Sequence, residues 1–327
     1  MSATDRAAPA AATPTVALMV TCLADVFYPE VGEKIVRLLR RLGVAVTVPP
    51  GQTCCGLPLF NSGYHAAAAA VARRTVALFG DAEQVVVPSG SCAWMVRHEY
   101  PGLLTDPGER GAAERLAART HEFSQFLVNR VGRRQFRSAV AGRLTYHDSC
   151  HLLRGLHESQ SPRALLRGLT GAEFVELPGC DECCGFGGSF AVRLPEVSSA
   201  ILDKKLANVE ATGADAVVAC DAGCLMQMRG GLSRRGSRVR ALHLAEVLEP
   251  GDDARLASPV STRRSGRGPD TPWRTRSCRK PSRSPPPSSS DSAERPSRRF
   301  PKARRSATAP GRSRRRRSSA SMPTWSA

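Results

Sequence analysis

Cysteines are the residues of this chain whose spacing points most directly to chemistry. Eight of the 11 cysteines form two sets of the same order: a single cysteine, an adjacent Cys-Cys-Gly, and a further cysteine. The sets are Cys22, Cys54, Cys55 and Cys92, and Cys150, Cys183, Cys184 and Cys224. Four converging thiolates suit a 4Fe–4S cluster or an all-cysteine zinc site, because both take soft sulfur ligands. Zinc usually binds cysteines in close C-x2-4-C pairs, which neither set contains, so the spacing favours iron–sulfur.

The adjacent cysteines require a bend in the backbone. Neighbouring side chains diverge along an extended segment, so both sulfurs reach one centre only where the loop turns. Gly56 and Gly185 follow the two pairs directly and supply the residue that tolerates such a turn.

The two sets are related by a nearly constant offset. Corresponding cysteines are separated by 128, 129, 129 and 132 residues, which indicates an internal duplication. Short apolar runs alternate with helical periodicity in both halves. We expect strands at 16–21, 44–48, 84–88, 144–147, 173–177 and 216–219, and helices at 31–42, 64–79, 162–169 and 196–211.

This alternation predicts an α/β fold of two similar domains, each with a mostly parallel sheet flanked by helices. The predicted organisation is a flexible leader (1–14), a first domain with a connecting helical stretch at about 112–136 (15–135), a second domain (136–250) and a disordered tail (251–327). Ligand sites of parallel sheets lie beyond the carboxyl ends of the strands, where Cys22, Cys92 and Cys150 fall.

Charge is concentrated in the predicted tail. The chain carries a formal net charge of +18, of which residues 251–327 supply +15 and residues 1–250 only +3. The Arg/Ser/Pro-rich tail cannot bury a core. It is open to three interpretations: an anion- or nucleic-acid-binding tail, a segment without function, or an out-of-frame extension of a natural chain that ends near Leu248. The nearly neutral remainder makes nucleic acid an unexpected partner.

The sequence predicts a cytoplasmic protein. It has no run of about 18 apolar residues, and Val16–Val20 is too short for a signal peptide. In such a chain, many cysteines indicate metal binding or catalysis rather than a disulfide framework.

These motifs identify the chain as similar to the cysteine-rich (CCG) domain family, which includes a subunit of the heterodisulfide reductases and the iron–sulfur subunits of glycolate- and lactate-oxidising systems. The similarity covers about residues 15–249 and is greatest to the lactate-utilization members. The stretches that carry it are 54–64, 88–92, 146–150, 183–190, 223–225 and 243–248.

The resemblance implies an iron–sulfur electron-transfer subunit that oxidises L-lactate to pyruvate together with two partners, a ferredoxin-like iron–sulfur protein and a smaller subunit. All eight cysteines would be cluster ligands, for one or two 4Fe–4S clusters per chain, with none of them catalytic. The alternatives are a subunit of a glycolate or other 2-hydroxy-acid dehydrogenase and, from another class, a zinc-stabilised binding module whose tail binds nucleic acid. The second half is the favoured site, because Phe186–Ser189 adds backbone N–H groups near its sulfurs.

One departure from the family pattern affects the expected chemistry. The heterodisulfide reductase type ends each motif in C-x2-C and uses five cysteines for a non-cubane cluster, whereas this chain has Ser89 and Asp221 at the extra positions. Four thiols per half instead suit a cubane cluster. The run His147-Asp-Ser-Cys-His151 could be taken for a Cys/His nucleophile, but catalytic partners normally meet across a fold, so support of Cys150 is the preferred interpretation.

Overall fold

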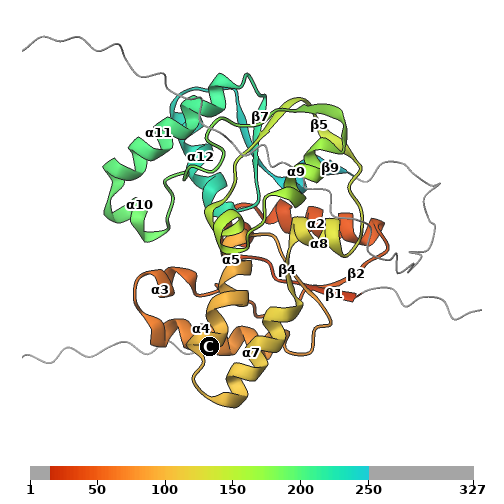
Figure 1. Ribbon diagram of the computed structural model, residues 1–327, viewed down its shortest axis with the longest axis vertical. Helices are drawn as coiled ribbons and strands as arrows, with labels where there is room; N and C mark the ends of the chain where they lie inside the picture. Colours follow the sequence, from red (N-terminus) through yellow and green to blue (C-terminus); the bar gives the residue numbers. More distant parts are fainter. Residues whose placement is uncertain (1–14, 250–327) are drawn as a thin grey trace, which may run out of the picture. The chain divides into compact units, whose positions relative to one another are not determined.

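The computed structural model describes residues 15–249 (Figure 1). The leader and tail predictions therefore lie outside the described residues. The structure confirms the predicted α/β class, with two parallel four-stranded sheets flanked by helices. A short antiparallel strand is added to the second sheet.

The first half is built on a sheet of order β2-β1-β3-β4. Its strands are β1 (Thr15–Leu18), β2 (Ala45–Thr47), β3 (Val85–Val87) and β4 (Thr120–Glu122). Its helices are α1 (Cys22–Phe27), α2 (Pro29–Arg41), α3 (Leu57–Asn61), α4 (His65–Phe79), α5 (Gly90–Trp94), the π-helix η1 (Met95–Glu99), α6 (Tyr100–Leu103), α7 (Pro107–Arg119) and α8 (Phe123–Asn129).

The second half repeats this arrangement with the order β6-β5-β7-β8. Its strands are β5 (Phe136–Tyr146), β6 (Leu169–Phe174), β7 (Ala216–Ala219), β8 (Arg240–His243) and β9 (Leu248–Glu249), which pairs with β5. Its helices are the π-helix η2 (His151–Gly155), α9 (Gln160–Arg167), α10 (Ser189–Arg193), α11 (Pro195–Ala211), α12 (Ala222–Arg234) and α13 (Leu244–Val247).

The elements follow from local patterns of apolar residues. All three valines of β3 are buried, as expected of a central parallel strand covered on both faces. Helix α2 begins with Pro29 at its first turn and buries Val31, Ile35 and Leu38 on one face.

The stretch predicted as a connecting helix at 112–136 is different in the structure. It consists of the end of α7, strand β4 and α8, and β4 is the fourth strand of the first sheet. The prediction of a continuous helix was wrong because a three-residue strand between helices has too few residues to show a period of two. Strand β8, of which the sequence analysis made no prediction, completes the second sheet in the same way.

The two halves share a hydrophobic core. One continuous cluster of buried side chains includes Leu18 and Val86 from the first sheet and Leu144 and Val218 from the second. A smaller cluster, around Leu206, belongs to the second half.

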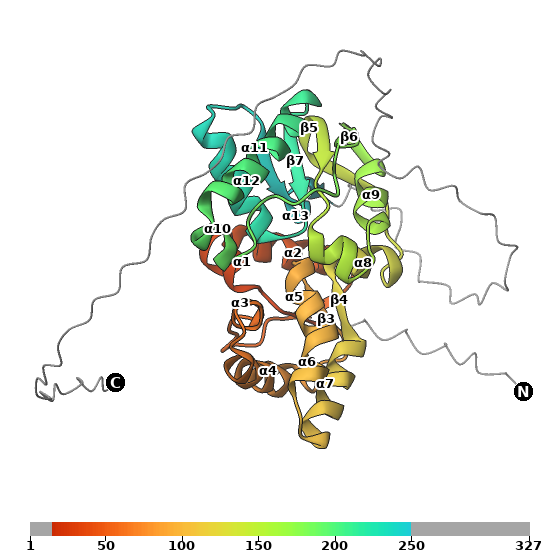
Figure 2. The ribbon, with the colours of Figure 1, turned by 60° about the vertical axis from the view of Figure 1, so that its left-hand side comes forward.

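The segments that follow β3 and β7 also join the halves, near α5 in Figure 2. The Gly90 amide donates to the Cys220 carbonyl (3.1 Å), and the Ser89 hydroxyl donates to the Asp221 carboxylate (2.9 Å). The two sets of cysteine-bearing loops therefore approach the same interface.

Candidate functional site

Each half places two of its cysteines just beyond the carboxyl ends of neighbouring strands. Cys22 opens α1 after β1, and Cys92 lies in α5 after β3. In the second half, Cys150 immediately precedes η2 after β5, and Cys224 lies in α12 after β7. Parallel strands bring these positions to one edge of each sheet.

The adjacent cysteine pairs lie on sharply turned loops, as the sequence predicted. Gly56 has φ +88° and Gly185 has φ +86°, in the left-handed region that favours glycine. Their amides donate to the sulfurs two residues back, with N–Sγ distances of 3.4 Å to Cys54 and 3.3 Å to Cys183.

The structure brings the four sulfurs of each set together. In the first half, the thiol of Cys54 interacts with those of Cys22 and Cys55, and the thiol of Cys55 also interacts with that of Cys92. We call this group the first-half site.

The second half repeats the chain of contacts, from Cys150 to Cys183, Cys183 to Cys184, and Cys184 to Cys224. We call this group the second-half site. Both sites contain two half-buried and two buried cysteines at corresponding positions. None of these eight cysteines is in a disulfide.

One thiol in each site is predisposed to ionise. Interactions with neighbouring thiols and the hydrogen bond from the following glycine amide lower the pKa of Cys54 and of Cys183, against the opposing effect of burial. Interactions with the thiols on either side, together with burial, raise the pKa of Cys55 and Cys184. Since the thiolate is the form that binds metal, each site offers one preformed ligand to an incoming cation.

Different side chains anchor the two loops. The Tyr100 hydroxyl donates to the Cys55 carbonyl (2.9 Å) in the first half. In the second, the fully buried Lys205 ammonium donates to the Gly179 carbonyl (2.5 Å), and the Ser198 hydroxyl donates to the Gly185 carbonyl (2.7 Å). Both loops are therefore held before any ligand binds.

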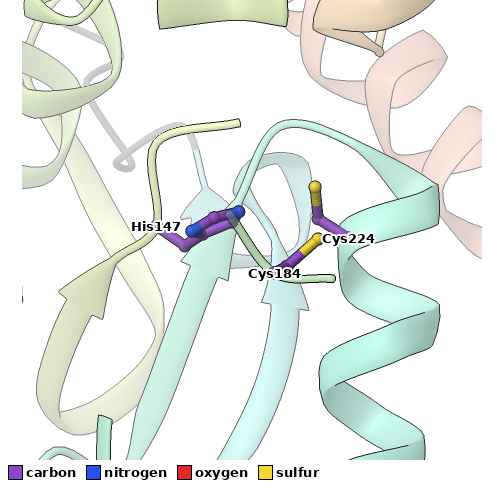
Figure 3. A group of neighbouring side chains, drawn as sticks. All are labelled: His147, Cys184 and Cys224. Atoms are coloured by element: carbon purple, nitrogen blue, oxygen red, sulfur yellow. The ribbon is translucent and has the colours of Figure 1, made fainter. Parts of the chain in front are cut away.

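A histidine of the run that was expected to support Cys150 lies beside the second-half sulfurs. His147 follows β5 and is fully buried, with one ring nitrogen and the sulfurs of Cys184 and Cys224 all within 4.8 Å of one another (Figure 3). Burial and the Lys205 ammonium lower the pKa of His147 to about 3, against opposing effects of Cys183 and the Cys180 carbonyl. The ring is therefore neutral and available to a metal or a sulfur. Its place immediately after a strand, three residues before Cys150, was the signal in the sequence.

Other residues of the same run have structural partners. Asp148 forms a buried ion pair with Arg163, with a shortest N–O distance of 2.7 Å, and the His151 ring packs against Trp94 at 4.8 Å between centroids. Neither contact resembles a nucleophile with its base. Cys220 is fully buried and accepts a hydrogen bond from the Tyr146 hydroxyl (3.5 Å).

The first-half site is reached from a surface pocket of about 300 Å³, which Cys22 and Cys54 line. Val26 and Val48 also line this pocket and are 68% and 47% exposed. The pocket gives this site an apolar rim at the surface.

The donor sets fit a group that takes soft ligands. Each site gathers four thiols, favours a thiolate in one of them, and keeps two sulfurs buried. In the second-half site, neither nitrogen of His147 makes a hydrogen bond of ordinary geometry among the described residues, as expected where a bound group would complete the contacts. Among residues 15–249, no helix has both the length and the apolar character needed to cross a membrane.

Comparisons with known proteins agree with this geometry. The cysteine-rich domain family, CCG, matches residues 16–97 and 144–229, one match in each half. Lactate utilization protein A of Halalkalibacterium halodurans is 47% identical over 234 residues, which cover 71% of this chain and 96% of that protein. Lactate utilization protein A 2 of Bacillus cereus strain Q1 is 42% identical over 237 residues, covering 72% of this chain and 98% of that protein. The chain belongs to the cysteine-rich CCG domain family, among relatives of the lactate utilization protein A type.

Proposed function

We propose that this protein is an iron–sulfur electron-transfer subunit of a multi-protein system that oxidises L-lactate to pyruvate. The observation that carries the proposal is the convergence of four thiols in each half, at matching positions and in matching degrees of burial. The relatives named for lactate utilization, which match nearly over their whole length, support the substrate.

The cysteines of the two sites would be the ligands. A cubane cluster held by four thiolates would supply one-electron storage and transfer. The chain's own contribution is to hold the thiols on glycine-turned loops, to favour the thiolate of Cys54 and of Cys183, and to shield the buried sulfurs from water.

Electron exchange requires an approach to the protein surface. The apolar rim of the first-half pocket, with exposed Val26 and Val48, is suited to contact a partner protein. The expected partners are a ferredoxin-like iron–sulfur protein and a smaller subunit, and the expected compartment is the cytoplasm. Lactate itself would be oxidised within that larger assembly.

Metal analysis tests the cofactor. Iron, acid-labile sulfide and zinc are measured per chain in the anaerobically purified protein, in Cys54→Ser/Cys55→Ser and in Cys183→Ser/Cys184→Ser. We expect about four iron and four sulfide per occupied site, with one site lost in each double variant. Cys220→Ser is the matched control, because that cysteine lies outside both sites, and it should retain the full content. Stoichiometric zinc without sulfide would refute the electron-transfer function.

A substrate test addresses the lactate assignment separately. The chain is isolated with its native partner subunits, and cluster reduction is followed by visible absorbance after addition of L-lactate, D-lactate or glycolate. L-lactate should bleach the cluster absorbance fastest. Faster bleaching by glycolate would show that the substrate is this 2-hydroxy acid and not lactate.

A further inference from the structure

The two duplicated sites differ at one buried position. His147 has no exposed surface, and neither its Nδ1 nor its Nε2 makes a hydrogen bond of ordinary geometry within residues 15–249; the Cys180 carbonyl provides only a weak contact. A buried imidazole without well-formed partners is costly, because the ring loses the hydrogen bonds it makes in water. Such a ring suggests a partner that is supplied when the site is filled.

The direction of the ring identifies where that partner would lie. Figure 3 shows the imidazole extending from the end of β5 toward the sulfurs of Cys184 and Cys224. These three ligand atoms come from three different segments and lie within 4.8 Å of one another. Imidazole nitrogen is a usual ligand of iron, and an imidazole N–H also donates to sulfur.

At the equivalent position, the first half has a residue without a side-chain nitrogen. The backbone amide of His147 donates to the Val218 carbonyl (2.9 Å), and that of Met19 donates to the Val86 carbonyl (2.9 Å). The two bonds are equivalent. The first connects the residue that follows β5 with strand β7, and the second connects the residue that follows β1 with strand β3. Met19 therefore occupies the position of His147, and it is likewise buried. A thioether has no N–H to donate.

We propose that His147 is a nitrogen contact of the cluster in the second-half site, that it raises the reduction potential of this cluster, and that the two duplicated clusters are thereby chemically unlike. This inference rests on the proposed iron–sulfur function. The contact raises the reduction potential whether the nitrogen binds iron in place of a thiolate or its N–H donates to a sulfur. In both cases the extra negative charge of the reduced cluster is better stabilised.

The experiment isolates each cluster in the full-length chain. The double variant Cys54→Ser/Cys55→Ser keeps only the second-half cluster, and His147→Leu or His147→Gln is added to this variant. Cys183→Ser/Cys184→Ser leaves the first-half cluster, into which Met19→Leu is introduced as the matched control. Iron and sulfide content is measured first, and each reduction potential is then determined by an anaerobic titration monitored by electron paramagnetic resonance.

We expect His147→Leu to move the second-half potential to a more negative value, and Met19→Leu to move the first-half potential much less. Recovery of part of the shift in His147→Gln, whose amide N–H can donate, supports the contact as a hydrogen bond. An unchanged potential in His147→Leu, with sulfide retained, overturns the inference but leaves the proposed function intact. If neither of the two double cysteine variants contains sulfide, the proposed iron–sulfur function itself is refuted.

A second measurement needs no substitution at His147, so it tests the inference even if the His147→Leu variant does not assemble a cluster. Histidine labelled with ¹⁵N is incorporated into the chain that carries only the second-half cluster, and nitrogen coupling to the reduced cluster is recorded by pulsed paramagnetic resonance. We expect a coupling that changes with the isotope and survives His151→Leu, since His151 adjoins Cys150 in the sequence and interacts with Cys183. No isotope-dependent coupling would overturn the inference.

Discussion

Individual glycines determine whether the paired cysteines can face one centre. Gly56 and Gly185 have nearly the same positive φ, yet their surroundings differ. A Cβ on Gly56 would meet the Val71 side chain at 3.4 Å, an ordinary contact. A Cβ on Gly185 would lie 2.4 Å from the backbone carbonyl oxygen of Ser198, which cannot move without shifting α11.

Alanine substitution should therefore affect the two loops unequally. Gly56→Ala should lower the free energy of unfolding by roughly 1–2 kcal/mol, the usual cost of a left-handed alanine. Gly185→Ala should lower it by more and reduce the metal content of the second-half site, because the loop must move away from Ser198. Urea unfolding and metal analysis of both variants check this. Equal losses in the two variants would contradict the argument.

A single buried carboxyl group gives this protein a pH dependence unrelated to the cysteines. Glu122 is fully buried at the start of α8, where its Oε2 accepts from the Ser124 and Gln125 amides, and burial raises its pKa to about 7. The folded chain therefore holds this proton more tightly than the unfolded chain. Between about pH 4.5 and pH 7, stability should fall as pH rises, because the folded state must either retain the proton or bury the charge.

Glu122→Gln should remove this part of the pH dependence. At pH 8 the variant should be more stable than the wild type by about 3 kcal/mol, and at pH 4.5 or below the two should be similar. The amide oxygen of glutamine can still accept from the helix amides. Urea unfolding of both proteins at the two pH values measures the difference, and a variant that is less stable at pH 8 would show that the carboxylate is favourable.

At the scale of elements, the amino ends of α5 and α12 bind the halves to one another. The positions that carry additional cysteines in the heterodisulfide reductase type are Ser89 and Asp221 here. The structure brings them together, with one Asp221 oxygen accepting from the Ser89 hydroxyl, the Ser91 amide and the Ser91 hydroxyl. These residues thus connect the amino ends of the two helices that bear Cys92 and Cys224.

Asp221→Ala should lower the free energy of unfolding by about 2 kcal/mol, because it leaves Ser89 and Ser91 donors without their acceptor. The control is Asp203→Ala. The Asp203 side chain is 66% exposed and pairs with Arg235 at the surface, so its loss should change stability by less than about 0.5 kcal/mol. Thermal or urea unfolding compares the variants. A similar, small effect of both substitutions would exclude the proposed link between the loops.

At the scale of the whole molecule, the duplicated halves are not independent in their packing. The main hydrophobic cluster crosses between them, with Leu39 and Phe123 from the first half and Leu165 and Val247 from the second. In addition, the Arg229 guanidinium of α12 lies 4.2 Å from the centroid of the Tyr28 ring. Separation would expose this apolar surface of both halves to water.

We therefore expect the full chain to unfold in one cooperative transition. A fragment of residues 1–135 should show none, whereas residues 136–327 should retain some order around the smaller cluster near Leu206. Circular dichroism during heating of the three proteins makes the comparison. A cooperative transition in the 1–135 fragment would show that the predicted boundary at 135/136 separates autonomous domains.

The sequence by itself determined the features that repeat. Two cysteine sets at a nearly constant offset revealed the duplication and the turned loops, and apolar runs such as Ala216–Ala219 located strands that the structure confirms. These signals are local or periodic, so they can be recognised in the linear sequence. Assignment of the eight cysteines to a cofactor stays a prediction until metal analysis is done.

Only the tertiary structure decided which distant side chains meet. Strand β4 is too short to have a period, and it becomes recognisable through its pairing with β3. Ser89 and Asp221 are 132 residues apart in the sequence and hydrogen-bonded in space. The sequence placed His147 near Cys150, but only the fold brings it beside the sulfurs of Cys184 and Cys224. Contacts between segments depend on the path of the chain in three dimensions, which residue spacing does not encode.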